Sequence, residues 1–164
     1  MVRTCRWGSW QDAIFLGVAV LVLVLDQASK AWIKSNVPLG GAVYDLGFFR
    51  IGHYLNTGAA FGMFRDQTLV LTIVSVVGAL AILYFVLNSR RFLPFMSTGW
   101  GKVVLGLVLG GTLGNLVDRL WYSSVTDFID FSFFPSFNVA DSAISVGAVL
   151  VAIYFLRHFS PQKV

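Results

Sequence analysis

The stretch TLVLTIVSVVGALAILYFVL, Thr68 to Leu87, contains no charged side chain. A hydrocarbon core about 30 Å thick needs about 20 mainly apolar residues per helix, so this stretch predicts a membrane-spanning helix. Three further apolar runs lie outward from it along the chain, at about residues 10–32, 100–118 and 138–157. The predicted fold class is therefore an all-α membrane protein with four transmembrane helices.

Composition supports the same class. Of the 164 residues, 57% are hydrophobic and 12% are charged, against about 25% charged residues in ordinary soluble domains. These values exclude a soluble globular protein and a disordered chain. Cys5 is the single cysteine, so the chain can form neither an intramolecular disulfide nor a zinc site built on several cysteines. We expect one integral membrane domain over residues 1–164, with no metal and no other cofactor.

Basic residues predict the orientation of the spans. Four spans place both termini on one side, and that side carries seven basic residues: Arg3, Arg6, Arg90, Arg91, Lys102, Arg157 and Lys163. The other side carries five: Lys30, Lys34, Arg50, Arg65 and Arg119. Because Lys and Arg favour the cytoplasmic side, both termini are predicted to be cytoplasmic. The basic residues form no continuous stripe, so no nucleic-acid partner is expected despite the net charge of +4.

The first span has a second interpretation as a secretory signal peptide. Arg3 and Arg6 precede the apolar core AIFLGVAVLVLVL, Ala13 to Leu25, as in such peptides. Cleavage after this core would leave an odd number of spans. We therefore expect this span to be retained as an anchor.

Unusual polar residues collect at the non-cytoplasmic ends of the spans. They are Asp26, Lys30, Asn56, Asn115, Asp118, Arg119, Asp127, Asp130, Asn138 and Asp141. A charge at the bilayer centre costs at least about 2.5 kcal/mol, so such residues are rare unless they are paired or functional. The cytoplasmic halves of the same helices are expected to contain none. This one-sided distribution predicts a functional site at the outer surface.

Each of these residues also has a structural interpretation. Asp26 and Lys30 lie four residues apart on one helical face and could neutralise each other. Asn115 and Asn138 could be hydrogen-bond partners between helices. Glycines at four-residue spacing in the third span allow a neighbouring backbone to approach closely: Gly106, Gly110 and Gly114. None of these interpretations explains why the polar residues gather at one end.

A small β-sheet is predicted between the first two spans. Residues 37–66 are too polar and too interrupted by glycine to span, and they mix aromatic and β-branched residues in short runs. We expect this segment to form a cradle at the outer surface. The aromatic segment after the third span, WYSSVTDFIDFSFFPSF, is expected to lie along the interface as a loop.

The residue types at the outer end favour carboxylate chemistry. The chain has no GxSxG or HExxH motif, and His53, His158 and Cys5 do not fall within the polar group. Two neighbouring carboxylates can share one proton, one activating water while the other protonates the substrate. Spacing pairs Asp141 with one of Asp118, Asp127 or Asp130 and does not choose among them.

Five motifs resemble the lipoprotein signal peptidase (signal peptidase II) family. They are DQASK (26–30), NTGAAFG (56–62), GNLVDR (114–119), VTDFID (125–130) and FNVADSA (137–143). The resemblance implies an aspartic endopeptidase of the bacterial inner membrane. It would cut prolipoproteins on the amino side of the diacylglyceryl-modified cysteine, near the periplasmic face. Asp127 and Asp141 would form the catalytic dyad, and Asp130 would be interfacial or structural.

The same resemblance implies roles for further residues. Residues that hold the substrate or orient the dyad would be Asn56, Gly58, Asn115, Arg119 and Asn138, and those with supporting roles would be Asp26, Lys30 and Asp118. The implied partners are a lipid-modified prolipoprotein, membrane lipid and inhibitors of the globomycin type.

Another class of protein could also hold Asp and Asn inside a helical bundle, namely a small transporter or a proton-conducting protein. A conduction path needs polar groups along its full length, and here the cytoplasmic half is predicted to be apolar. A purely structural membrane protein would leave the one-sided group of carboxylates unexplained. The GxGD run of another type of membrane aspartyl protease is absent from the sequence.

Overall fold

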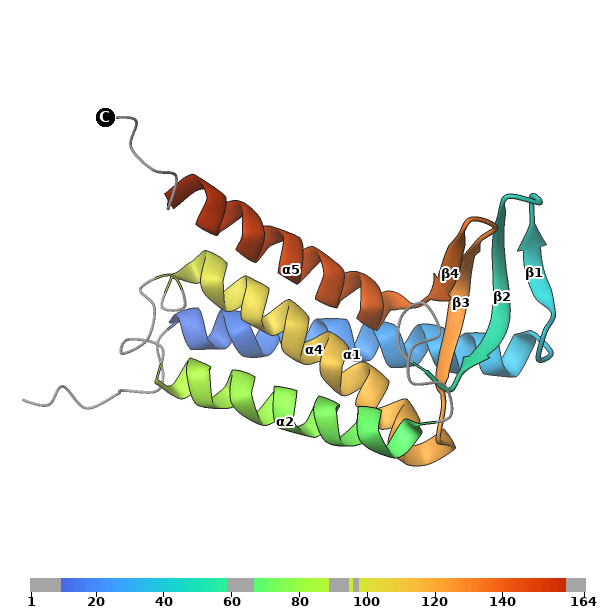
Figure 1. The fold of residues 1–164 in the computed structure, drawn as a ribbon, viewed down its shortest axis with the longest axis horizontal. Helices are drawn as coiled ribbons and strands as arrows, with labels where there is room; N and C mark the ends of the chain where they lie inside the picture. The colour runs from blue at the N-terminus through green and yellow to red at the C-terminus, as the bar shows by residue number, and fades with distance from the viewer. Residues whose placement is uncertain (1–9, 59–66, 89–94, 96–97, 159–164) are drawn as a thin grey trace, which may run out of the picture.

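The computed structural model describes residues 10–58, 67–88, 95 and 98–158. Its four long helices are α1 (Trp10–Asn36), α2 (Thr68–Leu87), α4 (Gly99–Tyr122) and α5 (Val139–His158). All four are long and apolar enough to cross a membrane. Figure 1 shows them side by side, with a small sheet at one end of the bundle. The predicted class of a four-span helical membrane protein is confirmed.

Helix α4 packs between α1 and α5 and also contacts α2. The predicted close approach at its glycines is present. A Cβ atom added at Gly110 would lie 2.6 Å from the backbone oxygen of Ala19, and one added at Gly106 would lie 2.8 Å from that of Phe15. Because no side chain fits there, α1 and α4 pack backbone against backbone along this line.

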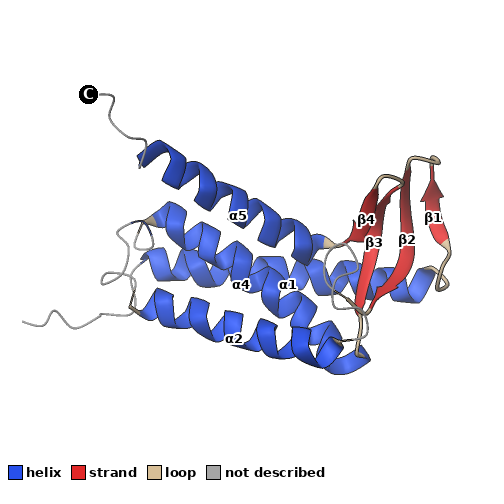
Figure 2. Ribbon diagram, in the orientation of Figure 1, coloured by secondary structure: helices blue, strands red, loops and turns tan. Residues whose placement is uncertain are grey.

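The sheet has four antiparallel strands in the order β1 (Ala42–Asp45), β2 (Phe49–Asn56), β3 (Val125–Phe131) and β4 (Phe134–Phe137). Figure 2 shows them as one layer beside the end of α1. Strands β1 and β2 fall inside the predicted β segment, whereas residues 59–66 lie outside the described part of the chain. The expectation of a loop after the third span is wrong, since residues 125–137 supply two strands. In register, Tyr54 faces Asp127 and Arg50 faces Asp130.

Helix α1 is longer than its apolar run. At about 1.5 Å per residue its 27 residues span about 40 Å, which exceeds the hydrocarbon thickness of about 30 Å by nearly two turns. Its last turns pack on the sheet, where Ile33 and Val37 form a buried apolar cluster with Phe128. This contact fixes β3 against the end of the bundle.

The other half of the bundle contains a buried ion pair that the sequence analysis did not anticipate. Lys102 of α4 lies with its Nζ 2.8 Å from Asp12 Oδ1 of α1, and Lys102 is only 3% exposed. The expectation that this half of the helices contains no unusual polar residue is therefore wrong at Asp12 and Lys102.

Candidate active site

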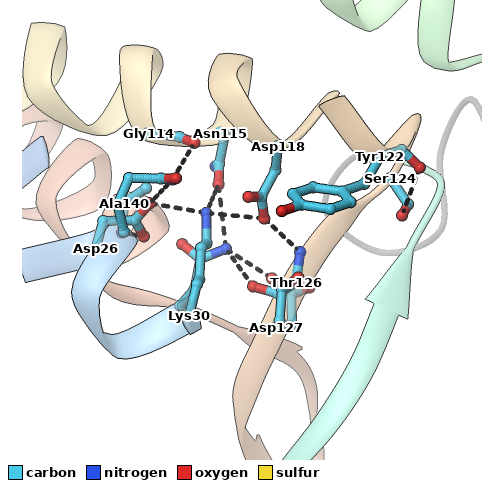
Figure 3. A network of polar contacts seen from close by, with 12 residues as sticks. Asp26, Lys30, Gly114, Asn115, Asp118, Tyr122, Ser124, Thr126, Asp127 and Ala140 are labelled. Atoms are coloured by element: carbon cyan, nitrogen blue, oxygen red, sulfur yellow. Dashed lines mark hydrogen bonds and ion pairs between the residues drawn. The ribbon is translucent and has the colours of Figure 1, made fainter. Parts of the chain in front are cut away.

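Most of the polar residues predicted for the site form one connected network at the sheet end of the bundle, where α1, α4, β3 and α5 meet (Figure 3). Asp26 and Lys30 come from α1, Asn115 and Asp118 from α4, and Asp127 from β3. Asp141 lies in the first turn of α5, and Asn138 directly precedes this helix. The network thus brings together side chains up to 115 positions apart, from Asp26 to Asp141.

Asn138 contacts both aspartates that the resemblance implied as a dyad. Its Nδ2 donates to Asp127 Oδ1 at 2.7 Å, and its Oδ1 accepts the backbone N–H of Asp141 at 3.0 Å. The backbone N–H of Asn138 in turn donates to Asp141 Oδ2 at 3.3 Å. This reciprocal pattern is a capping box, with Asn138 before the first turn of α5 and Asp141 at its third residue. One asparagine therefore fixes both carboxylates.

Asn115 is the second shared amide. Its Nδ2 donates to Asp141 Oδ1 at 2.7 Å, and its Oδ1 accepts from Lys30 Nζ at 3.0 Å and from Asn138 Nδ2 at 3.1 Å. An ammonium group has only donors, so Lys30 requires Asn115 to present its oxygen. The amide nitrogen of Asn115 is thereby directed at Asp141. The predicted hydrogen bond between Asn115 and Asn138 is confirmed.

Asn56 contacts Asp127 from the end of β2. Its Nδ2 donates to Asp127 Oδ2 at 3.0 Å, while its Oδ1 accepts the backbone N–H of Gly58 at 2.9 Å. The turn at Gly58 therefore orients the Asn56 amide. The rest of the NTGAAFG motif, residues 59–62, lies outside the described residues.

Asp127 is 0% exposed and accepts hydrogen bonds on both carboxylate oxygens. Burial, and secondarily the negative charge of Asp141, raise the pKa of Asp127 to about 7, although the amides of Asn56 and Asn138 and the charge of Lys30 oppose the shift. An ordinary aspartate has a pKa near 3.9. Asp127 can therefore hold a proton close to neutral pH.

The predicted ion pair of α1 is present and extends to α4. Lys30 Nζ lies 2.8 Å from Asp26 Oδ2 and 3.5 Å from Asp118 Oδ2. All three side chains are at most 1% exposed. Charges buried this deeply require partners, and the three supply them to one another. Asp118 is thus paired with lysine.

Two predicted site residues lie at the margin. Arg119 is half-buried, and its Nη1 is 3.5 Å from Ser75 Oγ on α2. Asp130 faces Arg50 across the sheet and is hydrogen-bonded to Tyr54. Burial, and secondarily the negative charge of Asp130, raise the pKa of Tyr54. Asp130 is therefore engaged on the sheet, in agreement with its exclusion from the dyad.

Lys34 contacts the same group of charges but was not among the predicted site residues. Its Nζ lies 3.2 Å from Asp118 Oδ1 and 3.7 Å from the centroid of the Tyr122 ring. Lys34 follows Lys30 by four residues and so shares its helical face, a signal that could have indicated this contact.

Known proteins match this chain over most of its length. A family model described as signal peptidase (SPase) II matches residues 18–157. A lipoprotein signal peptidase of Dehalococcoides mccartyi (strain ATCC BAA-2266 / KCTC 15142 / 195) is 42% identical over 144 residues, covering 87% of this chain and 89% of the relative. One of Shewanella baltica (strain OS155 / ATCC BAA-1091) is 40% identical over 153 residues, covering 87% and 86%.

A solved structure described as a bacterial membrane enzyme has a TM-score of 0.80 and 30% identity, and the match covers 92% of each chain. A second, described in the same words, has a TM-score of 0.75 at 30% identity, covering 89% of this chain and 94% of the other. The fold and the sequence therefore agree, and the chain belongs to the signal peptidase II family.

Proposed function

We propose that this protein is an aspartic endopeptidase that removes the signal peptide from diacylglyceryl-modified prolipoproteins, cutting on the amino side of the lipidated cysteine. The curated relatives are lipoprotein signal peptidases, which supports the substrate class. The observation that carries the aspartic mechanism is the pair of amides, Asn115 and Asn138, which ties Asp127 and Asp141 into one hydrogen-bonded group.

In this mechanism the two carboxylates hold one proton between them. Asp127 is fully buried and its pKa is raised to about 7, so it carries the proton and hydrogen-bonds the scissile carbonyl. Asp141 is partly exposed at the start of α5 and acts as the carboxylate that takes a proton from water. Asp127 then protonates the departing amine, and the pair returns to its starting charge.

The remaining polar groups orient the reactants. Asn56, held by Gly58, and Asn138 fix the two oxygens of Asp127, while Asn115 fixes Asp141. We assign Arg119, partly exposed one turn beyond Asn115, to the substrate backbone. The lipid anchor of the substrate stays in the bilayer, so a dyad near the periplasmic interface meets the peptide bond at matching depth. Inhibitors of the globomycin type would occupy the same site.

The test is processing of a lipidated precursor by purified protein in proteoliposomes. Asp127→Asn and Asp141→Asn should each insert normally and lower the cleavage rate by at least about 10²-fold, the range for loss of a general acid or base. Asp45→Asn, on the exposed β1 strand, is the matched control and should cleave like the wild type. Cleavage at the wild-type rate by either dyad variant would remove that residue from the mechanism. For a small transporter or proton-conducting protein, neither change would alter precursor length.

A further inference from the structure

The residue before each dyad aspartate donates its backbone N–H to a buried carboxylate of α1 or α4. Asp26 Oδ1 of α1 accepts the N–H of Ala140 at 2.9 Å, and Ala140 directly precedes Asp141. Asp118 Oδ2 of α4 accepts the N–H of Thr126 at 2.8 Å, and Thr126 directly precedes Asp127. The two contacts are equivalent although they involve a helix start in one case and a strand in the other.

Lys30 joins these two carboxylates. Its ammonium lies between Asp26 and Asp118, at 2.8 Å and 3.5 Å, as the dashed lines in Figure 3 show. Each of the three side chains is at most 1% exposed, so water does not screen the attraction between them. Buried ion pairs resist displacement, because moving one partner leaves an uncompensated charge. Both backbone amides are therefore linked, through Asp26 and Asp118, to the ammonium group of Lys30.

We infer that Asp26, Lys30 and Asp118 form a charged brace that sets the separation of Asp127 and Asp141, and that they are positioning residues for the proposed cleavage. The inference rests on the proposed function, since it assigns a purpose to the spacing of the two aspartates. A dyad shares one proton only at close range, so a small displacement of either backbone lowers the rate. The brace acts on the backbones that precede the two aspartates, through Thr126 and Ala140.

Lys34 completes the brace at its accessible side. Its ammonium is 3.2 Å from Asp118 Oδ1 and it is 23% exposed, whereas Lys30 approaches Oδ2 of the same carboxylate. The two lysines thus hold both oxygens of Asp118. Because Lys34 lies at the edge, it can be replaced without leaving a fully buried charge unpaired.

The experiment compares matched Asp→Asn variants in the proteoliposome assay. Asp118→Asn and Asp26→Asn remove carboxylates of the brace. Asp12→Asn removes the partner of the buried Lys102, which joins the same two helices at the opposite end of the bundle. All three leave a lysine with a weakened partner, so a general loss of stability would affect all of them. Insertion and folding are checked by size-exclusion chromatography and thermal unfolding.

Asp118→Asn and Asp26→Asn should lower kcat by about tenfold or more while KM changes by less than about threefold. The alkaline limb of the pH profile should move to lower pH, because a loosened pair of like charges moves apart and repels less. Asp12→Asn should keep the wild-type kcat and pH profile. Lys34→Met should lower kcat by about threefold, and Lys34→Arg should restore it by restoring the charge.

A folded Asp118→Asn variant with wild-type kcat and pH profile would overturn the brace, as would an equal loss of kcat in Asp12→Asn. If Asp118→Asn fails to insert, the comparison of Lys34→Met with Lys34→Arg tests the inference instead. An unchanged kcat in Lys34→Met then overturns it. Asp127→Asn in the same assay separates a failure of the brace from a failure of the proposed function. Wild-type kinetics in the brace variants with inactive Asp127→Asn would leave the proposed function standing, whereas cleavage by Asp127→Asn would overturn the function itself.

Discussion

Asp127 is surrounded by groups that act on its charge in opposite directions. Burial and the charge of Asp141 favour the protonated form, while the amides of Asn56 and Asn138 and the ammonium of Lys30 favour the carboxylate. The resulting pKa of about 7 makes this side chain a proton donor at neutral pH. The proposed acid role thus depends on burial more than on any single contact.

The pH dependence of cleavage follows from this balance. Since the pKa of Asp127 is raised to about 7, we expect kcat/KM to fall as the pH rises through about 7 and the pair loses its proton. It should also fall in acid, where the pair takes up a second proton. Steady-state cleavage of a lipidated precursor across this range measures both limbs.

Asn56→Ala provides the diagnostic variant for this prediction. Its hydrogen bond lowers the pKa of Asp127, so its loss should move the alkaline limb to higher pH by up to about one unit. Asn36→Ala, which removes only a bond to the Trp32 carbonyl at the end of α1, should leave the limb in place. If the alkaline limb of the pH profile does not move in Asn56→Ala, this limb does not report the titration of Asp127.

The four helices could be predicted because a run of about twenty apolar residues is typical of a membrane-spanning helix. The end of α1 was placed too early, at about residue 32, because Lys34 and Asn36 in its last turn are polar. In the structure Lys34 pairs with Asp118 of α4, and Asn36 is exposed. Strands β3 and β4 could not be predicted. Val125–Phe128 is buried throughout and shows no alternation, and its pairing partner β2 lies about 70 residues away in the chain.

The proposed catalytic pair, too, could be predicted only in part from the sequence. Residue types and their position at one end predicted carboxylate chemistry, but spacing did not choose among Asp118, Asp127 and Asp130. In the structure Asp118 is paired with two lysines, whereas Asp127 shares Asn138 with Asp141, and these long-range contacts favour Asp127 in the proposed dyad. Asp127 itself was expected on a loop and lies on a strand.

The contact between α1 and α4 predicts that alanine substitutions at two glycines differ in their effect on stability. Gly110→Ala would place a methyl group 2.6 Å from the Ala19 carbonyl oxygen and force the helices apart. We expect the free energy of unfolding to fall by about 1–3 kcal/mol. Gly78→Ala on α2, where nothing lies within 4 Å, is the control and should be neutral or stabilising by up to about 1 kcal/mol. Thermal unfolding in detergent measures both, and equal stability of the two variants would contradict backbone packing at Gly110.

In the helical bundle, α1 begins and α5 ends at the end away from the sheet (Figure 1). The sheet and the polar network share the other end. The basic residues predict that the end where α1 begins is cytoplasmic, and on this prediction the network would lie at the periplasmic face. Substrates anchored in the outer leaflet would then reach it without crossing the bilayer.

Cysteine labelling in spheroplasts tests this orientation. Ser132 lies exposed between β3 and β4, so Ser132→Cys in a Cys5→Ser background should react with a membrane-impermeant maleimide in intact spheroplasts. The native Cys5 should react only after lysis. Reaction of Cys5 in intact spheroplasts, with Ser132→Cys protected until lysis, would reverse the proposed topology.

The most direct test of a shared-proton dyad is a double-variant cycle on the cleavage rate. Asp127→Asn, Asp141→Asn and the combined variant are compared with the wild type in the same proteoliposomes. Residues that act as one unit lose their function together, so the combined variant should be no slower than the single variants within about threefold. Single variants whose losses multiply in the combined variant, or a single variant that still cleaves at the wild-type rate, would contradict joint catalysis by the two aspartates.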